Sequence, residues 1–300
     1  MLRGYEMNRR EFLKYSGLLL MMSRFLGERA GAAAEPSVVA VAEGKDYGAI
    51  TKRAVNAVGG IGRFVKAGNT VVVKPNMGWD RRPEQAATTH PAVVKAIAEE
   101  CVKAGAKRVR VFDNPCNDMR RCYEDSGIQA ALKGMKNVEV RYIEDERYKK
   151  VKIKGTFLKE WEIYGDALSA DVIINAPIAK HHSLTQVTLA LKNMMGVMGG
   201  DRGFIHRQIE DALADLNSTV KSHLVVIDAT RILTAHGPTG GSLADVKVLN
   251  KVIASTDIVA ADAYATGLFG LKPHDIPITV TAHKRGLGEI NLDKIKVVRA

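Results

Sequence analysis

The chain is short of cysteine and of aromatic residues, and each shortage excludes a class of protein. Three cysteines among 300 residues are too few for a disulfide-rich scaffold, and no C-x-x-C pair occurs. Aromatic residues make up 6% of the chain, and its basic residues are interspersed with acidic ones rather than gathered in blocks. The net charge of +11 therefore does not indicate nucleic-acid binding, and a small anionic ligand explains it better. Nucleotide-binding fingerprints are also missing.

Long apolar runs are absent as well. The longest candidate near the start is interrupted at Arg24 after about seven apolar or small residues, far below the roughly 20 that a membrane-spanning helix needs. The preceding "NRREFLK" at 8–14 resembles a twin-arginine export signal, and "AGAAAEP" at 30–36 offers small residues for cleavage. We therefore expect residues 1–34 to be a signal segment read by the twin-arginine export machinery. The mature protein would then start near Glu35, be periplasmic or otherwise exported, and keep no stable membrane span. A basic amphipathic helix is the alternative.

Short apolar runs rich in β-branched residues alternate with longer helical patterns through residues 35–300. The strand patterns lie at 70–76, 108–114, 171–177, 223–229 and 251–256, and the helical ones at 90–106, 207–220 and 257–270. No linker or repeat divides them. The alternation predicts a single α/β domain with a mostly parallel central sheet flanked by helices. Residues 138–165 predict a small antiparallel β insertion.

Polar side chains follow several of these strands at their C-terminal ends. In an open parallel sheet these ends share one edge, where ligands bind. We therefore expect the following side chains to converge: Lys74, Asn76, Asp113, Asn114, Cys116, Asn175, Lys180, His181, His182, Asp228 and Arg231.

The stretch 179–196, "AKHHSLTQVTLALKNMMG", mixes this chemistry with apolar residues. "SLTQ" fits a capping box, which predicts a helix from about 184 to 195. In such a helix, residues three or four apart lie on the same face. One face would then be polar, with Thr185, Thr188 and Lys192, and another would be apolar, with Leu184, Leu191 and Met195. Lys180 and the two histidines would lie at the helix N-terminus, which favours an anion. The following loop, 199–207, contains Arg202 and His206 and either closes over a ligand or simply connects two helices.

The cysteines and the paired histidines leave alternatives open. Cys101 falls in a helical pattern typical of a packed core thiol. Cys116 and Cys122 lie in a loop-like run with five residues between them. They form a disulfide, bind a metal or remain free, and an oxidising compartment favours the disulfide. Adjacent histidines on a strand point to opposite sides, so only one of the pair, such as His181, is a candidate metal ligand.

A set of short motifs, in order from about Val38 to Val298, resembles the domain of unknown function 362 family. The motifs are "KPN", "THP", "DNPCNDMRRCYEDSGI", "INAPIAKHH", "TLALKNMMG", "DRGFIH", "GPTGG", "STDIVAADAYA" and "GLG". The resemblance implies an association with iron–sulfur clusters and is strongest to a subgroup with twin-arginine signals. This chain lacks the ferredoxin-type cysteine run, so we expect no self-contained cluster. Residues within the motifs are Lys74, Asn76, His90, Asp113, Lys180, His182, Lys192, Asn193, His206 and Asp262.

These observations favour an exported enzyme, dependent on a cofactor or metal ion, that binds a small anionic molecule at the strand ends. The candidate catalytic residues are His182, His206, Asp113 and Asp228. The candidate ligand-binding residues are Lys74, Asn76, His90, Lys180, Thr188, Lys192, Asn193 and Arg202. The candidate metal ligands are Cys116, Cys122 and His181. The alternative is a non-catalytic periplasmic binding protein, or a redox or iron–sulfur accessory protein with a redox partner.

Overall fold

Eight strands form one continuous path through the central sheet of a computed structural model that describes residues 36–300. The order is β12 (Lys296–Arg299), β1 (Val38–Glu43), β11 (Val246–Ser255), β10 (Leu224–Leu233), β7 (Val172–Ala176), β2 (Thr70–Pro75), β3 (Arg108–Val111) and β4 (Val138–Val140). Neighbouring strands are parallel except around β11, which is antiparallel to both β1 and β10. The predicted mostly parallel sheet is confirmed.

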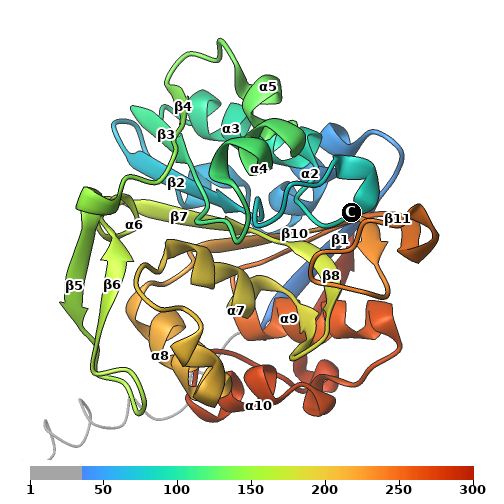
Figure 1. Cartoon of the computed structure of the whole chain (residues 1–300). Coiled ribbons are helices and arrows are strands. Elements are labelled where there is room, and N and C mark those ends of the chain that lie inside the picture. Colours follow the sequence, from blue (N-terminus) through green and yellow to red (C-terminus); the bar gives the residue numbers. More distant parts are fainter. Residues whose placement is uncertain (1–35) are drawn as a thin grey trace, which may run out of the picture. The chain divides into compact units, whose positions relative to one another are not determined.

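Helices cover both faces of this sheet (Figure 1). One face has α2 (Tyr47–Ala57), α3 (Pro91–Lys103), α4 (Met119–Asp125) and α5 (Ile128–Leu132). The other has α7 (Ala190–Asn193), α8 (Ile209–Thr219), α9 (Ile258–Thr266) and α10 (Pro277–Lys284). Each layer encloses its own apolar core. The central strands are therefore buried on both sides, which is why they read in the sequence as unbroken apolar runs.

The predicted antiparallel insertion at 138–165 is correct in part. A separate two-stranded antiparallel sheet is formed by β5 (Tyr148–Lys152) and β6 (Glu160–Tyr164), followed by the short helix α6 (Gly165–Ser169). Residues 138–140, however, form β4 and pair in parallel with β3 at the edge of the central sheet.

The predicted helix from 184 to 195 is wrong. The chain instead forms an antiparallel hairpin of β8 (Ile178–His182) and β9 (Gln186–Thr188), and the helix α7 begins only at Ala190. His182 Nδ1 accepts the backbone N–H groups of Leu184 and Thr185 and thereby stabilises the turn. "SLTQ" is therefore a turn rather than a helix cap, and Leu184, expected in the core, is 72% exposed.

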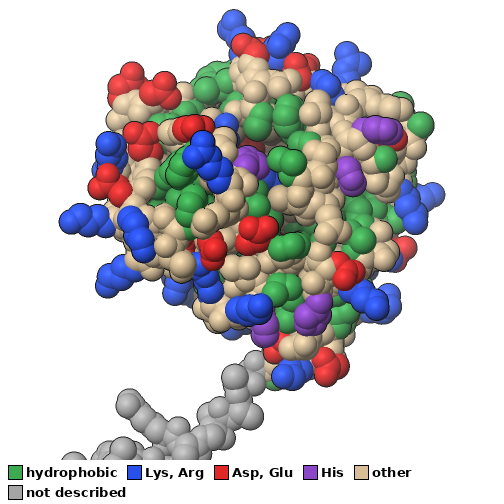
Figure 2. All heavy atoms as spheres, turned by 60° about the horizontal axis from the view of Figure 1, so that its bottom comes forward, with side chains coloured by type: hydrophobic (Ala, Val, Ile, Leu, Met, Phe, Trp, Pro, Cys, Tyr) green, Lys and Arg blue, Asp and Glu red, His purple; other side chains and the backbone are tan. Residues whose placement is uncertain are grey.

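The proposed export signal at 1–34 lies outside the described residues, so export stays a prediction. Within residues 36–300, no helix is both long and apolar enough to cross a bilayer. Lys and Arg side chains are interspersed with Asp and Glu over the face shown in Figure 2.

Candidate functional site

A cavity of about 350 Å³ opens where β2, β3 and the β8–β9 hairpin end. Of the residues expected at the strand ends, it brings together Lys74, Asn76, Asp113, Asn114, Cys116, Lys180 and His182. From the predicted helix, the following loop and the family motifs, it adds Thr188, Lys192, Asn193, Arg202 and His206. It also includes residues that the sequence argument did not select, namely Gly78, Trp79, Ser183, Leu184, Met195, Gly196 and Pro238. Trp79 directly follows "KPNMG" at the end of β2, and that position could have identified it.

A buried ion pair forms the floor of the cavity. Lys74 Nζ lies 2.7 Å from Asp113 Oδ1, and both side chains are nearly inaccessible to solvent. The other oxygen, Asp113 Oδ2, accepts the backbone N–H of Met77 at 2.7 Å. Burial lowers the pKa of Lys74, and the charge of Asp113 opposes that shift. Both carboxylate oxygens of Asp113 are therefore engaged, which makes it a partner that holds Lys74 rather than a free base.

Asn193 joins three elements behind this ion pair. Its Oδ1 accepts hydrogen bonds from Lys74 Nζ at 3.0 Å and from Asn76 Nδ2 at 3.1 Å. Its Nδ2 donates to Asn175 Oδ1 at 2.8 Å. The amide thus ties α7 to the ends of β2 and β7. These contacts use its whole polar end, so it orders the cavity wall from within the protein.

Asp262 on α9 holds the start of α7. Its two carboxylate oxygens accept the backbone N–H groups of Ala190 and Leu191, at 2.7 and 2.9 Å. Burial raises the pKa of Asp262 to about 7. Asp262, which the family resemblance had marked, therefore lies behind the cavity wall and positions the helix that places Lys192.

Two buried lysines face the cavity without an acidic partner. Lys180 is 1% exposed, and its Nζ donates to Asn76 Oδ1 at 3.2 Å and to the Ala87 carbonyl at 2.6 Å. Lys192 is 8% exposed, and its Nζ lies 3.3 Å from Met195 Sδ. Burial lowers the pKa of Lys180 to about 7 and that of Lys192 to about 8. Among residues 36–300, the charge of Asp113 acts on Lys180 from beyond ion-pair distance, and an anion in the cavity would supply a direct ion pair to both lysines.

The two histidines of the cavity are held in opposite tautomers by their partners. His182 Nδ1 accepts two backbone N–H groups, so its proton lies on Nε2. Burial and the charge of Lys192 lower its pKa to about 3. His206 Nδ1 lies 3.0 Å from the Arg202 carbonyl, which only accepts, so Nδ1 has the proton and Nε2 the free lone pair. Burial also lowers the pKa of His206. At neutral pH, His182 is therefore a hydrogen-bond donor and His206 a base.

Thr188 contributes a hydroxyl that no group within residues 36–300 satisfies. Its side chain is 4% exposed and lines the cavity, and its Oγ1 has no hydrogen-bond partner among the described residues. Because a buried hydroxyl without a partner is costly, a ligand in the cavity is a natural partner for it. The sequence placed Thr188 correctly beside Lys180 and Lys192, although through a helix that does not form.

Besides Cys122, three predicted site residues lie outside this cavity. Asp228 accepts the backbone N–H groups of His90 and Thr230, at 2.7 and 2.9 Å, and is fully buried. His90 caps α3, its Nδ1 accepting the N–H of Ala92. His181 Nδ1 accepts the N–H of Gly237, and the side chain lines a neighbouring hollow rather than this cavity. His90 and Asp228 thus have structural roles, because their polar atoms bond to the backbone and neither side chain lines the cavity.

All three cysteines are free thiols in the structure, so the expected disulfide between Cys116 and Cys122 is not formed there. Cys116 is exposed at the cavity, whereas Cys101 and Cys122 are buried, and burial raises the pKa of each buried thiol to about 12. Among residues 36–300, no group of three or more His, Cys, Asp or Glu side chains is placed to hold a metal ion. The proposed ligands Cys116, Cys122 and His181 do not converge, and the thiols do not fit an iron–sulfur cluster.

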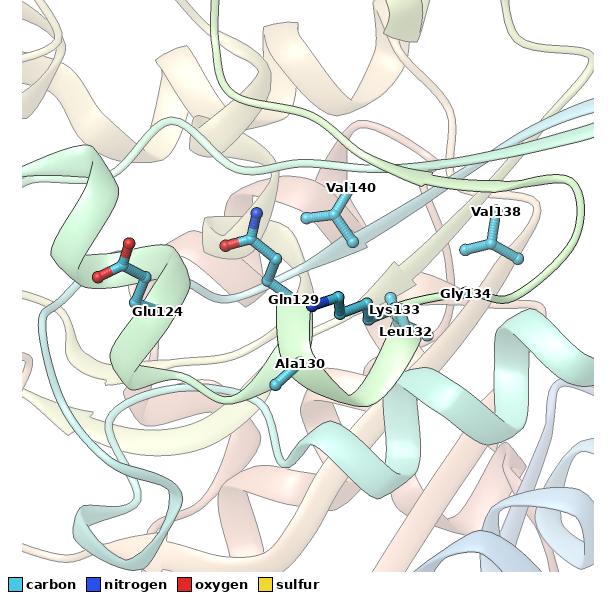
Figure 3. Close-up of a pocket in the computed structure, with 8 residues that line it drawn as sticks. All are labelled: Glu124, Gln129, Ala130, Leu132, Lys133, Gly134, Val138 and Val140. Carbon is cyan, nitrogen blue, oxygen red and sulfur yellow. The ribbon is translucent and has the colours of Figure 1, made fainter.

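A second hollow, of about 540 Å³, lies between α4, α5 and β4 (Figure 3). Its charged lining residues, Glu124 and Lys133, are both solvent-exposed. No buried polar group faces it, so it lacks the features of a binding site that the cavity at the strand ends has.

Comparison with known proteins agrees with the motif analysis. The chain is 28% identical over 239 residues to the "Thylakoid-associated protein sll1697" of Synechocystis, covering 77% of this chain and 72% of that protein. Among solved structures, the lactate racemase apoprotein from Thermoanaerobacterium thermosaccharolyticum aligns with a TM-score of 0.49 and 12% identity. That alignment covers 76% of this chain and 56% of the other, so this chain spans little more than half of that structure. Residues 71–267 match the family described as "Domain of unknown function (DUF362)", and the chain therefore belongs to this family.

Proposed function

We propose that this protein is an enzyme that binds a small anionic molecule, such as a carboxylate or a phosphate, in the cavity at the strand ends. The observation that carries the proposal is the pair Lys180 and Lys192. Both are buried in the cavity wall, and neither has an acidic partner among the described residues. Burying two ammonium groups without compensation is costly, and a protein that keeps them gains from a ligand of opposite charge.

The remaining groups supply orientation and proton transfer. The hydroxyl of Thr188 is available to the bound anion, and His182 Nε2–H donates a hydrogen bond without itself taking a charge. His206 Nε2 accepts a proton from the ligand, and its Nδ1–H stays fixed on the Arg202 carbonyl. This division of roles favours chemistry that begins with deprotonation of the bound molecule.

Export belongs to the same proposal. A twin-arginine signal at 1–34 would deliver the folded protein to the periplasm, where the cavity would meet its ligand. Fusing residues 1–34 to a reporter, with Arg9 and Arg10 replaced by lysine as the control, tests this proposal directly. A reporter that stays in the cytoplasm with the native segment would remove export from the proposal.

Anion binding is expected to weaken with rising pH. The pKa values of Lys180 and Lys192 are about 7 and about 8, and only the protonated forms attract an anion. Affinity should therefore be highest below pH 7 and fall at least about tenfold by pH 9. Titration with inorganic phosphate or oxalate, followed by the fluorescence of Trp79 in the cavity wall, measures this change. Equal affinity of oxalate at pH 6 and pH 9 would contradict the proposal.

Substitution of His206 by glutamine separates catalysis from binding. The variant keeps a polar side chain of similar reach but loses the basic nitrogen. We expect it to bind oxalate normally but to exchange the carbon-bound hydrogens of small 2-oxo and 2-hydroxy carboxylates with D₂O about a hundredfold more slowly. Proton NMR of the ligands follows the exchange. If the native protein binds these anions but leaves every one unchanged, it is a binding or accessory protein instead.

A further inference from the structure

Cys116 is the thiol among the cavity side chains, and the proposed function leaves its nucleophilic chemistry unused. It is exposed and lines the cavity, and its backbone N–H donates to the Gly78 carbonyl at 2.9 Å. That bond holds the loop after β3 against the loop after β2. The other two thiols, Cys101 and Cys122, are buried in the core beneath α3 and α4. Alkylating reagents should therefore reach Cys116 first.

Arg202 joins the loop of Cys116 to the histidine that acts as a base. Its guanidinium donates to the carbonyls of Asn114 and Pro115, both at 2.8 Å. Its own carbonyl accepts Nδ1–H of His206. One residue thus fixes the backbone beside the thiol and also the tautomer that leaves His206 Nε2 free to act as a base in the cavity that both side chains line.

The unsatisfied hydroxyl of Thr188 is independent evidence that a ligand belongs in this cavity. It is 4% exposed, lines the same cavity as Cys116 and has no partner in the described part of the chain. Lys180 and Lys192 make the cavity attractive to a carboxylate, and the Nε2–H of His182 is a donor that stays neutral. Together these groups suit a small carboxylate that also contains an electrophilic carbonyl group.

We propose that Cys116 is a covalent nucleophile for small carboxylates that contain a ketone or aldehyde group, with His206 as its base. This inference rests on the proposed function, because the same lysines hold the carboxylate. The Sγ–H proton passes to His206 Nε2 as the S–C bond forms and the C=O π bond breaks. The carbonyl oxygen takes the electron pair, accepts a hydrogen bond from His182 Nε2–H and is then protonated by His206. The product is a hemithioketal or hemithioacetal, with no leaving group and no redox partner.

The adduct can be observed with pyruvate labelled with ¹³C at the keto carbon. We expect a new protein-bound signal in the region of tetrahedral carbon, distinct from that of pyruvate hydrate. It should be lost in Cys116→Ala, in which phosphate binding and the far-ultraviolet circular dichroism should remain unchanged. The matched control is Cys101→Ala, which should keep the signal. A signal that persists in Cys116→Ala would overturn the assignment.

Alkylation rates provide a second measurement that does not need an adduct to accumulate. For each thiol, the measured quantity is the rate of alkylation by anionic iodoacetate divided by the rate with neutral iodoacetamide. This ratio should be about tenfold higher for Cys116 than for glutathione, because the lysines attract the carboxylate of iodoacetate. Replacing both Lys180 and Lys192 by methionine should remove this preference. Normal phosphate binding without either the ¹³C signal or the iodoacetate preference would refute the nucleophile and leave the anion site standing. Failure to bind phosphate or oxalate at all would refute both.

Discussion

Replacing both Lys180 and Lys192 by methionine is expected to weaken the binding of oxalate or phosphate about a thousandfold at pH 6.5. Each lysine would lose one charge-assisted contact to the anion, worth roughly 1.5 to 3 kcal/mol, and about 1.4 kcal/mol corresponds to a tenfold change in affinity. Methionine keeps most of the side-chain volume, so the cavity should not collapse. Isothermal titration calorimetry on the native and double-variant proteins measures the difference.

The control for this experiment removes two positive charges at a distance from the cavity. Lys154 and Lys284 are exposed and do not line it. Changing both to methionine lowers the net charge by the same amount, so it tests whether long-range attraction alone explains binding. We expect the control to change affinity less than about threefold at 0.15 M salt, because exposed charges are screened there. Equal losses in the two double variants would contradict a specific anion site.

The substitution Gly196→Ala should disrupt the cavity and the stability of the fold together. Gly196 lies in the 3-10 helix Met194–Val197, directly over the ion pair on the cavity floor. A Cβ atom there would overlap Asp113 Oδ1 and press on the end of Lys74. To make room, the buried pair must separate or the helix must move. We expect a loss of about 3 kcal/mol in the free energy of unfolding, from overpacking and from the disturbed pair. Anion binding should be lost as well.

Urea unfolding followed by circular dichroism measures this loss, and Gly267→Ala is the matched control. Gly267 is also helical, with φ of −61°, but a Cβ atom there would meet no other atom within 4 Å. The control should be neutral or slightly stabilising, by up to about 1 kcal/mol, because alanine restricts the unfolded chain. If Gly196→Ala is as stable as the native protein and binds oxalate equally well, the helix and the ion pair accommodate a Cβ atom at this position. The prediction would then be wrong.

The convergence of the site could be predicted because it depends on topology. Lys74 and Lys180 lie near the C-terminal ends of β2 and β8, and Asp113 follows β3. Because the C-terminal ends of parallel strands share one sheet edge, this order brings the three side chains together. Asp228 also comes after an apolar run in the sequence, but its side chain does not reach the cavity. β10 continues beyond Asp228 to Leu233, so this residue lies in the middle of a strand rather than at its end. Its carboxylate accepts the backbone N–H groups of His90 and Thr230.

The hairpin at 178–188 shows where local patterns mislead. "SLTQ" has the spacing of a helix cap, yet the β-branched residues Val187 and Thr188 are equally compatible with a strand. The imidazole of His182 resolves the conflict by accepting the N–H groups of the turn. A side chain that folds back on its own backbone competes with helix formation, and a count of residue spacing does not include that bond.

Chain order and apolar patterning were enough to predict the layered α/β fold and the sheet edge that bears the polar residues, because both follow from local periodicity and from the handedness of strand connections. Long-range contacts settled the chemistry of those residues. Lys74 forms an ion pair with Asp113, whereas Lys180 and Lys192 have no ion pair within 4.0 Å among residues 36–300. The tautomers of His182 and His206 likewise depend on carbonyl and N–H groups that only the folded backbone brings within reach. Burial and hydrogen-bond partners control charge and proton position, and both are properties of the assembled structure.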